Sequence, residues 1–257
     1  MGNLSDNDAT LGRDTLADLQ AAAERGDPAA MHDLGLLYSQ GEGGFPQDYA
    51  AALRWLDKAA KKKFPRAYYL LGIHHFNGLG VPLSRKNGVD WYFKAARAGV
   101  PEAMFQMGLC LQKGIEFQPD LDKALFWFRK ASEAGLADAD YKLGTLHSQG
   151  IHGEIDEARA VAHWKRAAAA GHPRALFNLG LCFINGYGGT SFEPVKAVCC
   201  WELAAAAKLP EAMRRLGEAC LDGPRTPERN ANAVKWFLLE DAVRHSMENP
   251  IFTRKDE

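Results

Sequence analysis

Residues 101–135 read PEAMFQMGLCLQKGIEFQPDLDKALFWFRKASEAG, and the spacing of the glycines in this stretch decides the fold. Gly108 is followed six residues later by Gly114. The same pair recurs along the chain, and its first glycine stands at Gly35, Gly72, Gly108, Gly144, Gly180 and Gly217, in steps of 36 or 37 residues. A fixed period in this range is typical of a solenoid, in which each unit buries its apolar face by stacking on its neighbours.

Each period contains two amphipathic segments. Residues 101–114 carry Ala103, Met107 and Leu111 at a four-residue spacing, which marks one face of a helix. The proline at the start suits a first helical turn, and the glycine at the end suits a left-handed cap. Residues 121–135 show the same apolar spacing and again end at a glycine. We therefore predict two antiparallel helices in each repeat, helix A and helix B.

The first glycine of each pair falls inside helix A, where glycine costs about 1 kcal/mol relative to alanine. Six such glycines indicate a place where a side chain would block close packing. We predict that helix B, or the next helix A, approaches at that point. An alanine five residues earlier in each copy fits the same contact, at Ala30, Ala67, Ala103, Ala139, Ala175 and Ala212.

The tryptophans occur once per repeat, all in helix B. They stand at Trp55, Trp91, Trp127, Trp164, Trp201 and Trp236. Trp164 and Trp201 lie one place later in their repeats than the first three. An aromatic stripe at the repeat spacing is more typical of a core than of a ligand site, so we expect these rings, Trp91 and Trp127 in particular, to be structural.

The composition excludes several classes of function. The 257 residues include 31 Lys+Arg and 32 Asp+Glu, a formal net charge of −1, which argues against non-specific binding to nucleic acid or to membrane surfaces. There is no apolar run long enough for membrane insertion, and the acidic residues 1–14 suit neither a signal peptide nor a presequence. The five cysteines do not form a disulfide framework. We expect a reducing, cytoplasmic location.

The stretch from Ala30 to Ala60, AMHDLGLLYSQGEGGFPQDYAAALRWLDKAA, resembles the Sel-1-like repeat, a relative of the tetratricopeptide repeat. The copies that start at Ala67 and Ala103 are just as similar. The resemblance implies an all-α fold, a right-handed α-solenoid of six helix-pair repeats with an N-terminal capping helix. The expected divisions are a disordered segment 1–14, a capping helix 15–27, repeats 28–64, 65–100, 101–136, 137–172, 173–209 and 210–246, and a tail 247–257.

The last repeat departs most from the pattern, as terminal repeats do because one of their faces meets solvent. We expect a solvated face there, made by Lys235, Glu240, Asp241, Arg244 and His245.

The resemblance also implies a function, because proteins of this class are mostly adaptors and assembly factors. The chain is therefore expected to be a non-catalytic interaction scaffold, monomeric outside its complex, that binds a peptide or helix segment of a protein on the concave helix-A surface. The predicted partner-binding residues form an aromatic ladder and a row of amide or charged groups: Tyr69, Phe105, Tyr141 and Phe177, with Asn77, Lys113, Gln149 and Asn185.

Alternatives remain open at this stage. The aromatic rings could serve only to pack helix A, and the amides could serve only to cap it. The protein could be a constitutive structural or assembly-factor subunit of a larger complex, including an organellar one. An enzyme is less favoured, although Cys199 and Cys200 beside His163 could supply a nucleophile and a base. No Cys/His spacing matches a zinc site, so we predict neither a metal nor a cofactor.

Overall fold

The computed structural model describes residues 16–151, 153–222 and 227–248, and these ranges contain helices and no strand. A helix over residues 16–24 comes first. The A helices are α2 (Pro28–Gln40), α4 (Pro65–Asn77), α6 (Pro101–Lys113), α8 (Ala137–Ser148), α10 (Pro173–Asn185) and α12 (Pro210–Leu221). The B helices are α3 (Tyr49–Lys61), α5 (Arg85–Arg97), α7 (Leu121–Glu133), α9 (Glu157–Ala169), α11 (Pro194–Ala206) and α13 (Pro227–Glu248). A short 3₁₀ helix, η1 (Tyr187–Gly189), follows α10. The predicted all-α fold of repeated helix pairs is confirmed.

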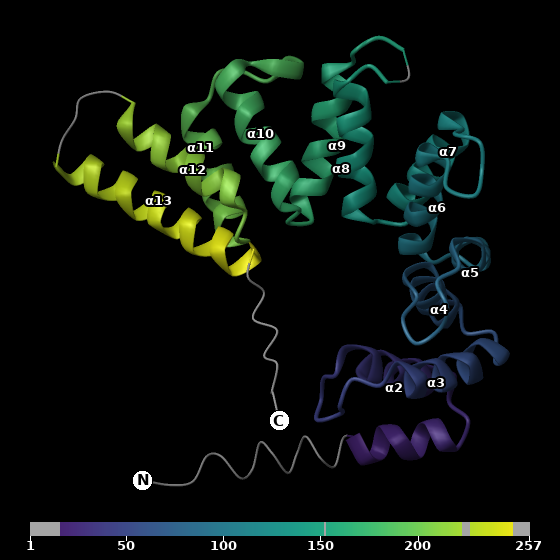
Figure 1. Ribbon diagram of the computed structural model, residues 1–257. Helices are drawn as coiled ribbons and strands as arrows, with labels where there is room; N and C mark the ends of the chain where they lie inside the picture. Colours follow the sequence, from purple (N-terminus) through teal and green to yellow (C-terminus); the bar gives the residue numbers. More distant parts are fainter. Residues whose placement is uncertain (1–15, 152, 223–226, 249–257) are drawn as a thin grey trace, which may run out of the picture. The chain divides into compact units, whose positions relative to one another are not determined.

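The chain forms two compact units, Met1–Gly135 and Leu136–Glu257. In the first unit the helix pairs are α2 with α3, α4 with α5 and α6 with α7, and in the second α8 with α9, α10 with α11 and α12 with α13 (Figure 1). Within a unit, helix B of one repeat also packs against helix A of the next. Each helix A is therefore held by its own helix B, and α4, α6, α10 and α12 are also held by helix B of the preceding repeat.

The helix ends follow directly from the sequence. α6 begins at Pro101, and Gly114 ends it in the left-handed region at φ 70°. The B helices α3, α5, α7 and α9 begin with a side-chain cap, as at Asp48, whose carboxylate accepts a hydrogen bond of 2.9 Å from the Ala51 amide. Asp120 caps α7 in the same way. These caps hold the loop between the two helices in register.

The glycine inside helix A lies against helix B of its own repeat. A Cβ placed on Gly72 would stand 2.5 Å from the Tyr92 ring, and one on Gly180 would stand 2.2 Å from Nε1 of Trp201. The residues that fill this helix-B position are Leu56, Tyr92, Phe128, Trp164, Trp201 and Phe237. The predicted close approach is confirmed, and helix B is the partner.

The tryptophans do not all occupy that position, which corrects the expectation of a single core stripe. Trp164 and Trp201 are buried against the glycines, whereas Trp55, Trp91, Trp127 and Trp236 are half-buried one residue earlier. Lys94 lies over the Trp91 ring, with its Nζ 4.0 Å from the ring centroid. The one-residue shift seen in the sequence therefore separates core tryptophans from tryptophans that cover the core and touch solvent.

The terminal repeat also differs from expectation. Glu240 is not part of a solvated face, because it is 5% exposed and its carboxylate accepts hydrogen bonds from Arg214 (3.0 Å) and Arg244 (2.7 Å). Burial alone would raise the pKa of Glu240, but the hydrogen bonds from the two arginines outweigh it and hold the pKa below its usual value. Asp241 and His245 are exposed as expected.

Candidate partner-binding surface

The four rings of the predicted aromatic ladder, Tyr69, Phe105, Tyr141 and Phe177, are all half-buried. Three of them contact another ring within their unit. The Phe105 and Phe128 centroids are 5.5 Å apart, those of Tyr69 and Tyr92 are 5.9 Å apart, and Tyr141 stacks on His172 at 4.5 Å. The ladder therefore contributes to packing within the repeats and leaves part of each ring at the surface.

The predicted row at the end of helix A is exposed at Asn77, Lys113, Gln149 and Asn185. Asn77 and Asn185 each donate a side-chain hydrogen bond to the carbonyl four residues earlier, at 3.0 Å and 2.9 Å. This interaction caps the helix end, which was the structural alternative for these amides. It orients the side chains and leaves each amide oxygen at the surface.

The predicted site residues lie on different helices of the two units. Tyr69 and Asn77 lie on α4 and Phe105 and Lys113 on α6, in the first unit. In the second unit, three members line one groove of about 390 Å³, namely Tyr141, Gln149 and Asn185. Phe177, on α10, is not among its lining residues. We name this cavity the helix-A groove.

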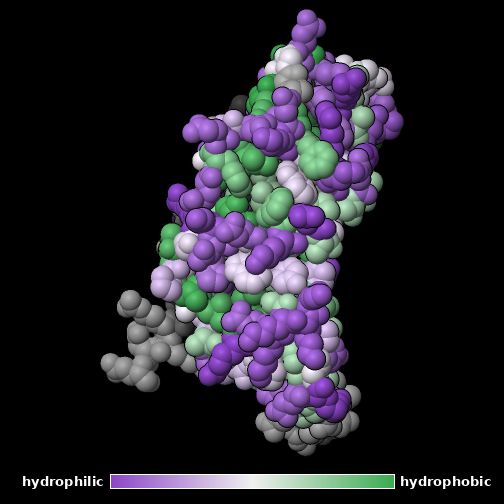
Figure 2. All heavy atoms as spheres, turned by 90° about the vertical axis from the view of Figure 1, so that its right-hand side faces the viewer, coloured by the Kyte–Doolittle hydropathy of each residue, from purple (hydrophilic) through white to green (hydrophobic). Residues whose placement is uncertain are grey.

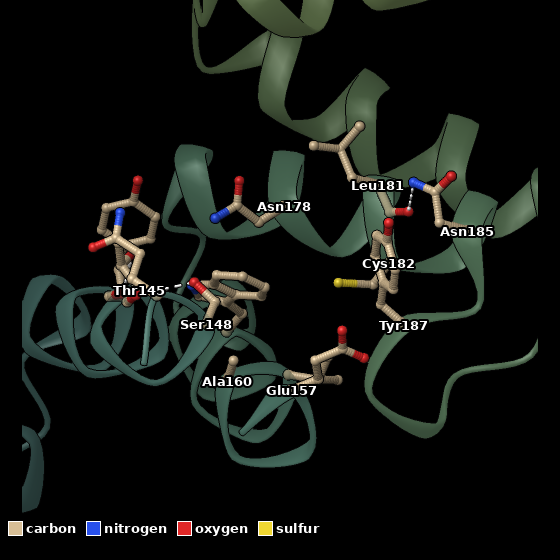
Figure 3. Close-up of a pocket in the computed structure, with 13 residues that line it drawn as sticks. Thr145, Ser148, Glu157, Ala160, Asn178, Leu181, Cys182, Asn185 and Tyr187 are labelled. Atoms are coloured by element: carbon tan, nitrogen blue, oxygen red, sulfur yellow. Dashed lines mark hydrogen bonds between the residues drawn. The ribbon is translucent and has the colours of Figure 1, made fainter. Parts of the chain in front are cut away.

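The floor of the helix-A groove is apolar. It is made by Ala160, Val161 and Trp164 of α9 and by Leu181 and Cys182 of α10. Ala160, Val161, Trp164 and Cys182 are buried, so the floor is part of the packed core of the second unit. Figure 3 shows Ala160 on one side of the groove and Cys182 on the other, with the Cys182 sulfur directed into the space between them.

Polar side chains surround this floor. Asn178 projects from α10, and its carboxamide is half-buried and makes no hydrogen bond to the residues that the structure describes (Figure 3). One carboxylate oxygen of Glu157 accepts a 3.2 Å hydrogen bond from the Gly188 amide. Tyr187 is 51% exposed. The groove therefore offers an amide, a carboxylate and a phenol beside an apolar surface, which is the composition of a site that binds a peptide.

Two hydroxyl groups on the α8 side are already engaged. The Thr145 hydroxyl donates to the Tyr141 carbonyl at 3.0 Å, and the Ser148 hydroxyl donates to the Thr145 carbonyl at 2.9 Å. The Tyr141 carbonyl is the counterpart of the Phe177 carbonyl, which accepts a 3.2 Å hydrogen bond from Nε1 of Trp201, on helix B of the same repeat as Phe177. Nε1 of Trp164 is buried and has no hydrogen-bond partner in the described residues. The Thr145 hydroxyl thus takes the acceptor that the indole would otherwise use.

Burial controls the chemistry of the groove cysteine. Burial, with a smaller contribution from the nearby Glu157 carboxylate, raises the pKa of the Cys182 thiol to about 11. The thiol is therefore protonated near neutral pH and contributes apolar surface instead of a nucleophile.

His74 and His163 could be considered as metal ligands, but both are held by other groups of the protein. His74 is 1% exposed, and its two ring nitrogens lie 2.8 Å from the Leu79 carbonyl and 3.1 Å from the Ser39 hydroxyl. Burial lowers its pKa. His163 lies 3.0 Å from the Asp140 carboxylate. In the part of the chain that the structure describes, no three His, Cys, Asp or Glu side chains converge as metal ligands would.

Sequence reasoning missed Glu157, Asn178 and Tyr187. Tyr187 directly follows the second glycine of its repeat, where the other copies carry Glu42, Leu79, Ile115, Ile151 and Pro224, so no repeated pattern marks it. Asn178 did carry a signal, because its equivalents on α2, α4 and α6 are Asp33, Leu70 and Gln106, so its position is not a core position. The described helices include none that is long and apolar enough to cross a lipid bilayer.

The fold defines a class of protein, one built from repeated pairs of antiparallel helices. Comparison with known sequences gives the family. The sequence profile of the Sel1 repeat matches residues 28–64, 65–100, 101–136, 137–172, 173–209 and 210–239. The chain therefore belongs to the Sel1 repeat family, whose fold is a protein-interaction scaffold.

Solved structures agree with this assignment. A Sel1 repeat protein from Oxalobacter formigenes is 28% identical over 86% of this chain and 89% of its own, with a TM-score of 0.79. The protective antigen c5321 of uropathogenic Escherichia coli is 29% identical with a TM-score of 0.72, and the match covers 89% of this chain and 49% of that longer protein. The immunity protein PA5088 of Pseudomonas aeruginosa is 14% identical over 90% of this chain and 88% of its own, with a TM-score of 0.58, and shares the fold. No curated protein sequence matched.

Proposed function

We propose that this protein is a non-catalytic interaction scaffold that binds an extended peptide segment of a partner protein on its A helices, with the helix-A groove as the principal contact. One observation carries the proposal. Three residues predicted from the repeat pattern, Tyr141, Gln149 and Asn185, line the same groove as the unpaired amide of Asn178. A reducing, cytoplasmic setting suits the five cysteines, all of which are free thiols.

The chemistry of the groove favours a peptide backbone over a compact ligand. A carboxamide both donates and accepts hydrogen bonds, so Asn178 can pair with the N–H and C=O of one residue of an extended chain. A second amide at Gln149 offers the same pairing from α8. The apolar floor beneath them can accept a side chain of the same peptide. Because the groove is already formed by packed helices, binding requires little ordering of the protein.

The remaining predicted residues, Tyr69, Asn77, Phe105 and Lys113, are proposed as a separate contact on α4 and α6 of the first unit. Their contribution is proposed as secondary, since the rings pack within their repeats. Each unit is proposed to contribute its own stretch of contact to the same partner.

The test is quantitative affinity purification at low salt with the wild type and with the double variant Gln149→Ala/Asn178→Ala. Asn232→Ala on α13 is the matched control, because Asn232 is an exposed amide of the same unit outside the groove. We expect recovery of the partner to fall about tenfold for the double variant, as for the loss of central contacts in an interface. Circular dichroism and the melting temperature should be unchanged for both variants.

Equal recovery by all three proteins would contradict the helix-A groove as the contact. The same purification separates an exchangeable adaptor from a fixed subunit. An adaptor sediments as a soluble monomer after elution, whereas a permanent subunit remains in a large complex under every mild condition.

A further inference from the structure

We propose a second interaction surface in the first unit, a pocket between α5, α6 and α7 that binds a peptide segment with a large apolar side chain and an adjacent Lys or Arg. The pocket has a volume of about 470 Å³, within the usual range of ligand sites. It is separate from the helix-A groove, which lies in the second unit. We name it the phenylalanine pocket.

Exposed phenylalanines surround this pocket and are not explained by packing. Phe93 on α5 and Phe117 in the loop before α7 line it, and each is 43% exposed. Phe126 on α7 is 52% exposed, and its ring centroid lies 5.4 Å from that of Trp127, which also lines the pocket. The Phe93 ring packs edge-on with Trp127, with the two ring centroids 6.3 Å apart. Phe93, Phe126 and Trp127 therefore form one aromatic cluster.

The other repeats show that the fold does not need these rings. The ninth residue of the 13-residue helix B is Asp57, Phe93, Arg129, Lys165 and Glu202 in α3, α5, α7, α9 and α11. The sixth residue is Arg54, Asp90, Phe126, Ala162 and Cys199 in the same helices. Phe93 is thus the one apolar residue among five equivalents, and Phe126 the one aromatic residue. Contiguous exposed aromatic surface of this kind marks interaction sites.

The pocket has the depth for an anchoring side chain. Val89, Met107 and Leu111 are buried residues of the core and also line the pocket, so its floor is apolar and rigid. A peptide side chain that lies on this floor beside Phe93 and Trp127 would be desolvated on several sides, as interface hot spots are. The face of the molecule that includes α5 and α7 shows hydrophobic atoms between rows of hydrophilic ones (Figure 2).

The charged side chains that line the pocket favour a Lys or Arg next to the apolar side chain of the partner. Lys123 is neutralised, because its Nζ lies 2.8 Å from the Asp120 carboxylate. Asp90 also lines the pocket, is exposed, and makes no ion pair with the described residues. The charge left for a partner in the lining is therefore negative. An adjacent Lys or Arg on the peptide would complement Asp90, whereas an acidic residue would be repelled.

The experiment uses a phage-displayed library of random peptides, panned on the wild-type protein and screened against the double variant Phe93→Asp/Phe126→Arg. These substitutions introduce, at Phe93 in the pocket lining and at Phe126 beside Trp127, the residues that α3 carries at the same positions, so the helix pairs are expected to fold. Phe192→Asp is the matched control, since Phe192 is 68% exposed and lies in the second unit. Melting temperatures confirm folding of all variants.

We expect a group of clones that bind the wild type and Phe192→Asp equally and lose at least about tenfold in affinity on the double variant. These clones should share a large apolar residue with Lys or Arg within one helical turn, and Asp90→Lys should weaken them severalfold. Clones retained by the double variant bind elsewhere, including in the helix-A groove.

Three results would overturn the proposal. In the first, no clone binds the wild type better than the double variant. In the second, the clones that do so carry acidic residues beside the apolar one, and in the third, they bind Asp90→Lys as tightly as the wild type. A different occupant would also overturn it. Concentration-dependent dimers lost in the double variant would assign the pocket to a second copy of the chain, and loss of binding to phosphatidylserine vesicles would assign it to a membrane.

Discussion

Replacing Gly108 with alanine is the sharpest perturbation of the repeat, because alanine is the better helix former and should still destabilise the protein. A Cβ at residue 108 would stand 2.5 Å and 2.6 Å from two atoms of the Phe128 ring. Phe128 is 0% exposed, so its ring has no free space into which to move. Overpacking of this kind costs about 1–3 kcal/mol, and the gain in helix propensity offsets about 1 kcal/mol of it. Because two atoms of the Phe128 ring would lie within 3 Å of the new Cβ, we expect the free energy of unfolding to fall by a net amount of about 1–2 kcal/mol.

The assay is urea unfolding of wild type and Gly108→Ala, followed by circular dichroism. Phe128→Ala supplies the control, since it removes the ring that the new methyl group would meet. In that background, Gly108→Ala should be neutral or should stabilise the protein by about 1 kcal/mol, the propensity term alone. A Gly108→Ala protein as stable as the wild type, or more stable, would refute close packing as the reason for the six glycines.

Other predictions follow from the same contacts. Trp201→Ala should cost about 3–5 kcal/mol and Trp91→Ala clearly less, because only the first ring is buried against a glycine; equal losses in urea unfolding would contradict this. Thr145→Val should raise the melting temperature slightly, because it frees a carbonyl for Nε1 of Trp164, worth about 1 kcal/mol; a lower melting temperature would argue against the competition between the two donors. The pKa of Glu240 is lowered in the folded state, so its stabilisation is present above the unfolded value of about 4.3 and is lost as the pH falls below it. The difference in melting temperature between wild type and Glu240→Gln should accordingly shrink from pH 7 to acid, and a constant difference would contradict the ion pairs.

The period of the glycines was sufficient to predict the helix pairs and their close contact. Every helix A needs a glycine at the point where its helix B approaches. This packing requirement therefore appears in the sequence as a glycine with a period of 36 or 37 residues. The ladder residues were harder to interpret. Tyr69 and Phe105 follow the period whether they bind a partner or pack on Tyr92 and Phe128, because packing within a repeat is itself periodic.

Features that break the period could not be predicted. The salt bridges of Glu240 depend on Arg214, which lies on the preceding helix at a position where other copies hold a ring. The helix-A groove depends also on Asn178 and Tyr187, which stand where the other copies hold different residues. We expect the specificity of the groove to reside in such departures, since the repeated residues also serve to build the fold.

The most direct test of partner binding at the helix-A groove is photo-cross-linking from residue 178. A photoreactive benzoylphenylalanine replaces Asn178 in one protein and Asn232 in another, and both are irradiated in an extract from the source cells. We expect a discrete protein adduct from residue 178 that is absent from residue 232, with the cross-linked peptide of the partner identified by mass spectrometry. The same adduct from residue 232, or none from residue 178 while the partner still co-purifies, would contradict binding at the helix-A groove.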